Sequence, residues 1–138
     1  MNGQDKIFQI LLAEDNPIDI LVTKEAMESW QVKFQLHVVE DGQEAVDFLL
    51  RRGIYDKVER PDVVLLDLNL PKKNGVEVLT HMRQDPDLSH VKVVVITTSG
   101  SESDLEMCRK LGVKIIITKP LDFEEYLGPY VKRGQVCF

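Results

Sequence analysis

Charged and hydroxyl side chains stand directly after several apolar runs in this sequence of 138 residues. Asp67 follows four apolar residues, and burying a carboxylate at such a place is costly unless it has partners. Glu14 and Asp15 follow an earlier apolar run, and two later runs end in Thr97 and Lys119. If these runs are strands of one parallel sheet, three acids, a hydroxyl and a lysine meet at one edge of it.

The acids have the composition of a site for a hard divalent cation. Carboxylates only a few ångströms apart repel one another unless a cation lies among them. Ligands that are all oxygen, with no sulfur or imidazole, favour Mg²⁺ or Mn²⁺. Magnesium keeps several of its waters, so two acids and the backbone carbonyl of Asn69 would suffice. We therefore expect a metal site that draws its ligands from Glu14, Asp15, Asp67 and Asn69.

Asp67 is at the centre of this set, and its carboxylate can attack a phosphoryl group to form an acyl phosphate. The metal and Lys119 would neutralise the negative charge that spreads over the phosphoryl oxygens during transfer. The Thr97 hydroxyl is a donor that can rotate toward a phosphate oxygen. The catalytic candidates are therefore Asp67, Thr97 and Lys119, with Asp67 as the site of phosphorylation.

Each of these residues also has a purely structural interpretation. Acids after strands are commonly solvated loop residues or helix caps, and Asp15 or Asn16 could cap the helix that follows. Lys119 stands before Pro120 and could be an exposed turn residue. Taken one at a time, the structural interpretation is favoured for every residue except Asp67. Taken together, polar groups at four strand ends in this order make coincidence improbable.

The apolar pattern predicts five strands that alternate with five helices. The strands are expected at residues 7–13, 34–39, 63–68, 91–97 and 113–118. The helices are expected after Pro17, after Gly42, after Gly75, through residues 105–111 and from residue 121. The first helix is inferred from apolar residues at helical spacing, namely Ile18, Leu21, Val22, Ala26 and Met27. Because the apolar strands are continuous rather than alternating, the expected fold class is α/β, a doubly wound five-stranded parallel sheet with helices on both faces.

The composition excludes several other classes of protein. A hydrophobic fraction of 43% and a charged fraction of 29% favour one globular domain. The net charge is −6 without a run rich in Lys and Arg, so we expect no contact with DNA or a membrane. No signal-peptide pattern is present, and Cys108 and Cys137 lack CxxC spacing, so we expect a cytoplasmic protein. The polar segment 51–61 is expected to be an exposed loop.

The motifs LLAEDN, LLDLNLP, VVVITTS and ITKP together resemble the response-regulator receiver domain of bacterial two-component signalling, over nearly the whole chain. The resemblance implies a flavodoxin-like fold, a histidine kinase as phosphoryl donor and a downstream protein target. It also implies Mg²⁺-dependent transfer that the receiver itself catalyses, with slow self-dephosphorylation. In this family Asp67 corresponds to the phosphoryl acceptor, Glu14 and Asp15 to the acidic pair, Thr97 to the switch hydroxyl, and Lys119 to the site lysine.

The stretch DLNLPKKNG and the long loop before PDVVLLD most resemble single-domain regulators paired with bacterial phytochromes. We therefore expect residues 1–138 to form one receiver domain, with a C-terminal segment from about 128 and no output domain. The resemblance also implies a cis Lys119–Pro120 peptide bond, and a homodimer through the fourth helix, fifth strand and C-terminal segment. Two residues depart from the family pattern: Ile116 replaces an aromatic residue, and Pro129 interrupts the fifth helix.

Three alternatives remain open on the sequence alone. A phosphatase of the haloacid-dehalogenase type needs a second acid two residues after its nucleophile, where this chain has Asn69. A flavin-binding protein needs hydrogen-bond donors in its first loop, where AEDNP offers carboxylates that repel phosphate. A receiver-like docking module that accepts no phosphoryl group is the third alternative, against which the complete set of acids and Lys119 argues.

Overall fold

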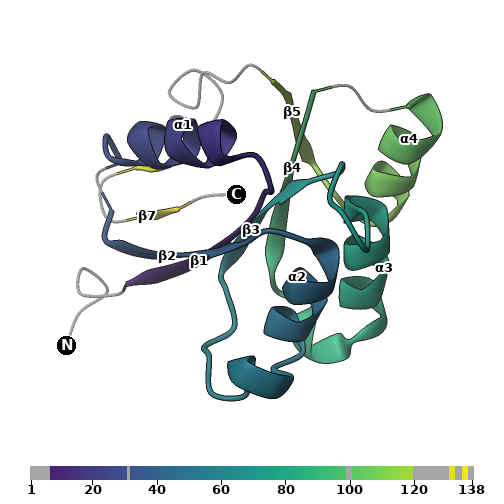
Figure 1. The fold of residues 1–138 in the computed structure, drawn as a ribbon, viewed down its shortest axis with the longest axis horizontal. Coiled ribbons are helices and arrows are strands. Elements are labelled where there is room, and N and C mark those ends of the chain that lie inside the picture. Colours follow the sequence, from purple (N-terminus) through teal and green to yellow (C-terminus); the bar gives the residue numbers. More distant parts are fainter. Residues whose placement is uncertain (1–6, 31, 99–100, 120–130, 133–134, 137–138) are drawn as a thin grey trace.

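The computed structural model describes residues 7–30, 32–98, 101–119, 131–132 and 135–136. Within them, five parallel strands form one sheet in the order β2-β1-β3-β4-β5 (Figure 1). These strands are β1 (Phe8–Ala13), β2 (Phe34–Val39), β3 (Val63–Asp67), β4 (Lys92–Thr97) and β5 (Ile115–Thr118). The parallel sheet and its five strands are as the apolar runs predict.

Helices cover both faces of the sheet, which confirms the doubly wound fold class (Figure 1). Helix α1 packs on one face, and α2, α3 and α4 pack on the other. Their bounds are α1 (Pro17–Met27), α2 (Gly42–Leu49), α3 (Gly75–Gln84) and α4 (Glu102–Lys110). None of the helices among the described residues is long and apolar enough to cross a membrane.

Several predictions about the C-terminal part lie outside the described residues. These are the fifth helix from residue 121, the cis Lys119–Pro120 bond and most of the C-terminal part of the expected dimer face. Beyond residue 130 the structure describes two short strands, β6 (Val131–Lys132) and β7 (Gln135–Val136), which pair antiparallel.

The central strands are mostly apolar because the sheet is buried on both faces there. Alternate residues of each central strand belong to two different core clusters. On β3, Val64 and Leu66 pack toward α2, α3 and α4, whereas Val63 and Leu65 pack toward α1. Asp67 is the first polar residue of this run, and it stands where the strand ends.

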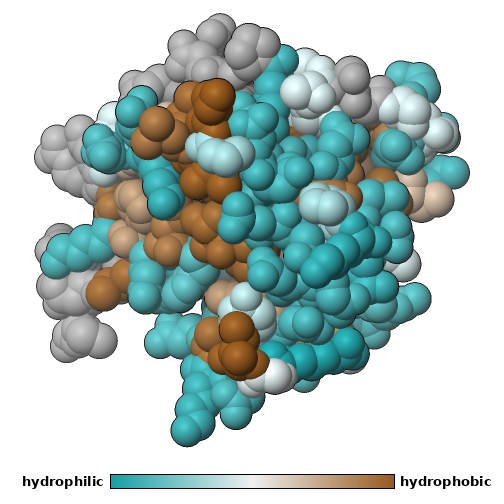
Figure 2. Space-filling view, viewed as in Figure 1, coloured by the Kyte–Doolittle hydropathy of each residue, from teal (hydrophilic) through white to brown (hydrophobic). Residues whose placement is uncertain are grey.

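Helix α1 is confirmed, but much of the apolar pattern that predicts it does not face the core. Ile18, Leu21 and Val22 are 71%, 56% and 38% exposed, and hydrophobic surface over α1 is visible in Figure 2. The buried residues of the helix are Thr23 and Met27. The helix therefore has apolar residues on two sides, and helical spacing alone does not indicate which side faces the sheet.

The segment 51–61 is not simply an exposed loop, which corrects the expectation from its polarity. Gly53–Tyr55 form a short 3-10 turn, η2, after α2. The Tyr55 ring packs against Phe48 with 5.2 Å between ring centroids, and Val58 also packs against the core. Two residues in a largely polar segment therefore anchor it to the domain.

Gly42 lets the start of α2 pack against the loop that leads from β3 to α3. Its N–H donates to the Pro71 carbonyl over 3.0 Å, and a Cβ at this position would overlap the Lys73 carbonyl group. We predict that Gly42→Ala lowers the free energy of unfolding in urea by about 2–3 kcal/mol, because backbone must move to admit the methyl group. Gly53→Ala is the control, since open space surrounds that exposed position and only its positive φ of 59° opposes a side chain. Equal losses of unfolding free energy in the two variants would contradict a steric requirement for glycine at position 42.

Candidate functional site

The polar residues predicted to meet do come together at the carboxyl ends of four strands. Glu14 follows β1, Asp67 ends β3, Thr97 ends β4 and Lys119 follows β5. The backbone N–H of Lys119 donates to the Thr97 carbonyl over 2.8 Å, which continues the pairing of the last two strands up to the site. Parallel strands thus bring together groups that are far apart in the sequence.

The Lys119 ammonium group is the hub of the site. It donates to Glu14 Oε1 over 2.5 Å, to Asp19 Oδ2 over 2.8 Å and to Asp67 Oδ2 over 3.0 Å. An ammonium group has three hydrogens, so each contact takes one of them. Burial by itself lowers the pKa of Lys119, but the hydrogen bonds that it donates to the three carboxylates raise this pKa above its usual value. The lysine is therefore a fixed positive charge at any physiological pH.

Asp19 is the site residue that the sequence reasoning missed. It lies in the first turn of α1, where an acid is ordinarily explained by the positive end of the helix dipole. A signal was present, because Asn16 and Pro17 mark a helix start directly beside the acidic pair. An acid in that first turn is placed at the same edge of the sheet as Asp15.

Asn16 caps the first helix, as its structural interpretation predicts. Its side-chain oxygen accepts hydrogen bonds from the N–H groups of Ile18 and Asp19, over 2.9 and 3.2 Å. It is thus the N-cap of α1. Asp15, the other candidate for this cap, is exposed and belongs to the acidic group instead.

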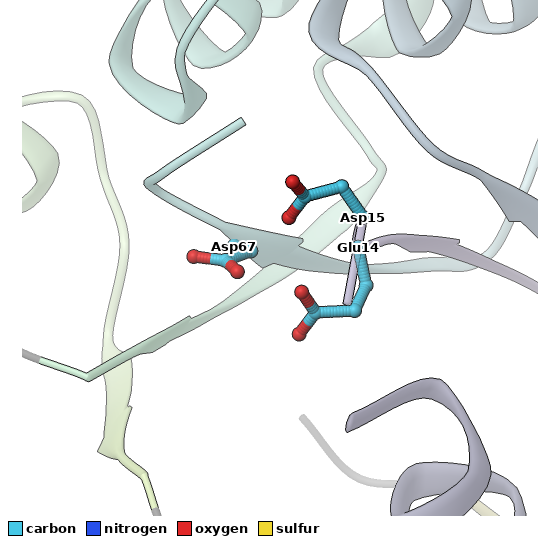
Figure 3. Close-up of side chains that lie close together, drawn as sticks. All are labelled: Glu14, Asp15 and Asp67. Atoms are coloured by element: carbon cyan, nitrogen blue, oxygen red, sulfur yellow. The ribbon is translucent and has the colours of Figure 1, made fainter. Parts of the chain in front are cut away.

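Glu14, Asp15 and Asp67 form an acidic group whose members each offer an oxygen within 4.8 Å of the others (Figure 3). Glu14 and Asp67 are buried and Asp15 is exposed. This donor set fits a hard divalent cation such as Mg²⁺ or Mn²⁺, since it is all oxygen and its exposed side leaves room for waters. The Asn69 N–H donates to Asp67 Oδ1 over 2.9 Å, and a ligand role for the Asn69 carbonyl stays a prediction.

Burial makes Glu14 an unusual acid. Loss of solvent, and after it the neighbouring Asp67 carboxylate, raise the pKa of its carboxyl group to about 7, although Lys119 opposes the rise. A cation at the acidic group would favour the charged form instead, so a proton and a metal ion compete for this residue.

Thr97 is buried, and its hydroxyl has no hydrogen-bond partner among the described residues. A buried hydroxyl without a partner costs about 1–3 kcal/mol. On β4, Thr97 directly follows Ile96, the residue that pairs with Asp67 on β3. The site therefore contains a polar group that is free to bond a ligand oxygen.

Comparisons with known proteins identify the family. The model of the response regulator receiver domain matches residues 10–128, and the chain belongs to this family. The response regulator Rcp1 of Synechocystis sp. is 40% identical over 116 residues, which are 84% of this chain and 79% of Rcp1. The receiver prediction is thereby confirmed against the phosphatase and flavin-binding alternatives.

Two solved structures resemble this fold over most of its length. One is the phosphorylated cyanobacterial phytochrome response regulator RcpA, with a TM-score of 0.80, 40% identity, and coverage of 88% of this chain and 86% of RcpA. The other is the Mn²⁺-bound form of Rcp1, with a TM-score of 0.79, 39% identity and 86% of each chain covered. These relatives include a receiver that is phosphorylated and one that holds a divalent metal ion.

Competition between a proton and Mg²⁺ for Glu14 predicts that Mg²⁺ binding depends on pH. The pKa of Glu14 is raised to about 7, so the proton must leave before the carboxylate can bind Mg²⁺ at lower pH. We expect the Mg²⁺ affinity, measured by calorimetry, to fall below about pH 7 and to approach a tenfold loss for each further pH unit. Glu14→Gln should bind Mg²⁺ more weakly and lose this dependence, whereas Asp15→Asn should bind more weakly and keep it. An affinity for Mg²⁺ that is constant between about pH 5.5 and 8 would refute the competition.

Proposed function

We propose that Asp67 accepts a phosphoryl group from a phosphohistidine of a histidine kinase, and that this protein signals through the phosphorylated form. The observation that carries the proposal is the set of contacts around Asp67, a buried carboxylate held by Lys119 beside two further acids. A positive charge and a metal-binding group next to one nucleophilic carboxylate are what phosphoryl transfer requires. The family membership and the phosphorylated relative support the same role.

In the proposed transfer, a carboxylate oxygen of Asp67 attacks phosphorus while the bond from phosphorus to the donor nitrogen breaks. The leaving imidazole nitrogen keeps the electron pair and takes a proton, and Asp67 becomes an acyl phosphate. Lys119 contributes positive charge next to Asp67 Oδ2, and the Asn69 N–H holds Oδ1. A divalent ion held by Glu14, Asp15 and Asp67 would add further positive charge against the phosphoryl oxygens.

Thr97 is the proposed sensor of the phosphoryl group, since its hydroxyl has no partner in the part of the chain that the structure describes and can donate to a phosphoryl oxygen. Ile116, at the position where the family usually has an aromatic residue, is partly buried and packs against the core on the side of α2, α3 and α4. We therefore propose that the signal passes through Thr97 and the segment after it, without rotation of a ring. The output is contact with another protein.

The exposed apolar residues of α1 are the proposed docking surface for the kinase. The donor histidine must reach Asp67, so the kinase has to lie over the edge of the sheet at which α1 begins. Ile18, Leu21 and Val22 are exposed on the helix whose first turn, through Asp19, contacts the site lysine. Apolar residues gathered on a surface commonly mark a contact with another protein.

A bacterial phytochrome is the proposed kinase, on the ground that RcpA is a phytochrome response regulator with 40% identity to this chain. The homodimer through α4, β5 and the C-terminal segment stays a prediction. So does a downstream protein target.

The acceptor assignment is tested by intact mass after incubation with acetyl phosphate and Mg²⁺. We expect the wild-type protein to gain the mass of one phosphoryl group and Asp67→Asn to gain none, because the amide is not a nucleophile of this kind. Asp56→Asn, which changes an exposed acid in the segment 51–61, should label like wild type. A gain of phosphoryl mass by Asp67→Asn would show that Asp67 is not the acceptor.

The docking surface is tested by comparing two phosphoryl donors. With an autophosphorylated phytochrome kinase, Leu21→Ala should lower the second-order rate constant of transfer at least about fivefold, because an apolar contact is lost at the interface. With acetyl phosphate, which needs no docking, the rate should stay unchanged. Ile54→Ala is the control, since Ile54 is 87% exposed on η2, away from α1. A kinase that transfers equally fast to Leu21→Ala docks elsewhere.

A further inference from the structure

The first turns of α1 and α3 use an acid in the same helical position for different purposes. In α3, the Asn74 N–H donates to Glu77 Oε1 over 3.4 Å, so the acid closes a capping box. In α1 the corresponding acid is Asp19, but the N–H of the N-cap residue donates to Glu14 Oε2 over 3.3 Å instead. The Asp19 carboxylate is thereby left to bond Lys119.

The contact between Asp19 and Lys119 is shorter than the contact between Asp67 and Lys119, at 2.8 against 3.0 Å. Every hydrogen of the ammonium group is already in use. A phosphoryl oxygen on Asp67 can therefore gain a hydrogen bond from Lys119 only by displacing a carboxylate or sharing the lysine with it. This consequence rests on the proposed function of Asp67.

Asp19 is the carboxylate that Lys119 can release most easily. Its side chain is 31% exposed, whereas those of Glu14 and Asp67 are 2% and 6% exposed, so water can solvate it once the lysine moves. Asp19 also lies outside the acidic group that fits a metal ion, so no cation there would compensate for its charge. A phosphoryl group adds about −1.5 to −2 of charge, which makes the competition for the single ammonium sharper.

We propose that Asp19 is a positioning residue that competes with the phosphoryl group for the ammonium of Lys119. Asp19 holds the lysine toward α1 in the unphosphorylated protein and thereby weakens the phosphorylated state. The balance between the two states is then set by an acid that neither accepts the phosphoryl group nor binds the metal ion.

The test measures the affinity for beryllium fluoride, an analogue of the acyl phosphate, at saturating Mg²⁺. We expect Asp19→Asn to bind the analogue about threefold to fivefold more tightly than wild type, which is the scale of a partly exposed ion pair. Its Mg²⁺ affinity should stay within about twofold of wild type, since Asp19 is not in the acidic group. A loss of structure would weaken the affinities for both beryllium fluoride and Mg²⁺. Tighter binding of beryllium fluoride with an unchanged Mg²⁺ affinity therefore indicates that Asp19 acts by positioning Lys119.

Glu25→Gln is the matched control, because it removes one negative charge from an exposed position on the same helix and should bind the analogue like wild type. In a Lys119→Ala background, Asp19→Asn should change the analogue affinity less than about twofold, since the group for which Asp19 competes is gone. Unchanged or weaker binding by Asp19→Asn, an equal gain in Glu25→Gln, or a full gain without the lysine would each overturn the proposal. Failure of the wild-type protein to bind the analogue would instead count against the proposed function itself.

Discussion

The shared ammonium group of Lys119 is the interaction on which the site depends. Its three carboxylate partners lie 105, 100 and 52 positions away in the chain, so one side chain joins β1, α1, β3 and the end of β5. Glu14 and Asp67 are almost completely buried, and an unpaired buried charge costs several kcal/mol. Without the lysine, repulsion and desolvation would act together on the acids at this edge of the sheet.

The sheet makes this concentration of charge possible because it confines charged residues to the strand ends. β1 and β3 lie side by side near the centre of the sheet, and helices cover both faces there. Side chains along these strands are therefore mostly apolar, with Gln9 as the polar exception, and acids appear only where the strands end. The same burial that demands a partner for Glu14 is also the largest cause that raises its pKa to about 7, with the Asp67 carboxylate acting in the same direction. Loss of solvent thus contributes to both the ion cluster and the sensitivity to protons and metal ions.

Helix α1 combines two tasks that the other helices among the described residues do not share. Its first turn supplies Asp19 to the site, while Ile18 and Leu21 beside it stay exposed. Helices α2 and α3, by contrast, bury most of their apolar residues against the sheet and against each other. A helix that reaches the site therefore also has apolar surface available to a partner. A protein bound there would lie directly over the acid that contacts Lys119.

The sequence by itself determined the strands, the type of sheet and most of the site. Local features can be recognised from the sequence alone, and they include the apolar runs, the cap at Asn16 and the acids at the ends of β1 and β3. The parallel sheet follows from central strands that are mostly apolar, and it brings Asp67 and Lys119 together in any chain with this order of elements.

Only the tertiary structure decided the rotation of α1, the anchoring of Tyr55 on the core and the entry of Asp19 into the site. These outcomes depend on which distant side chains meet, and the same helical spacing is compatible with either side of α1 facing the sheet. The role of Asp19 is the clearest case, because an acid in a first helical turn looks like a helix-dipole residue until Lys119 is seen 2.8 Å away.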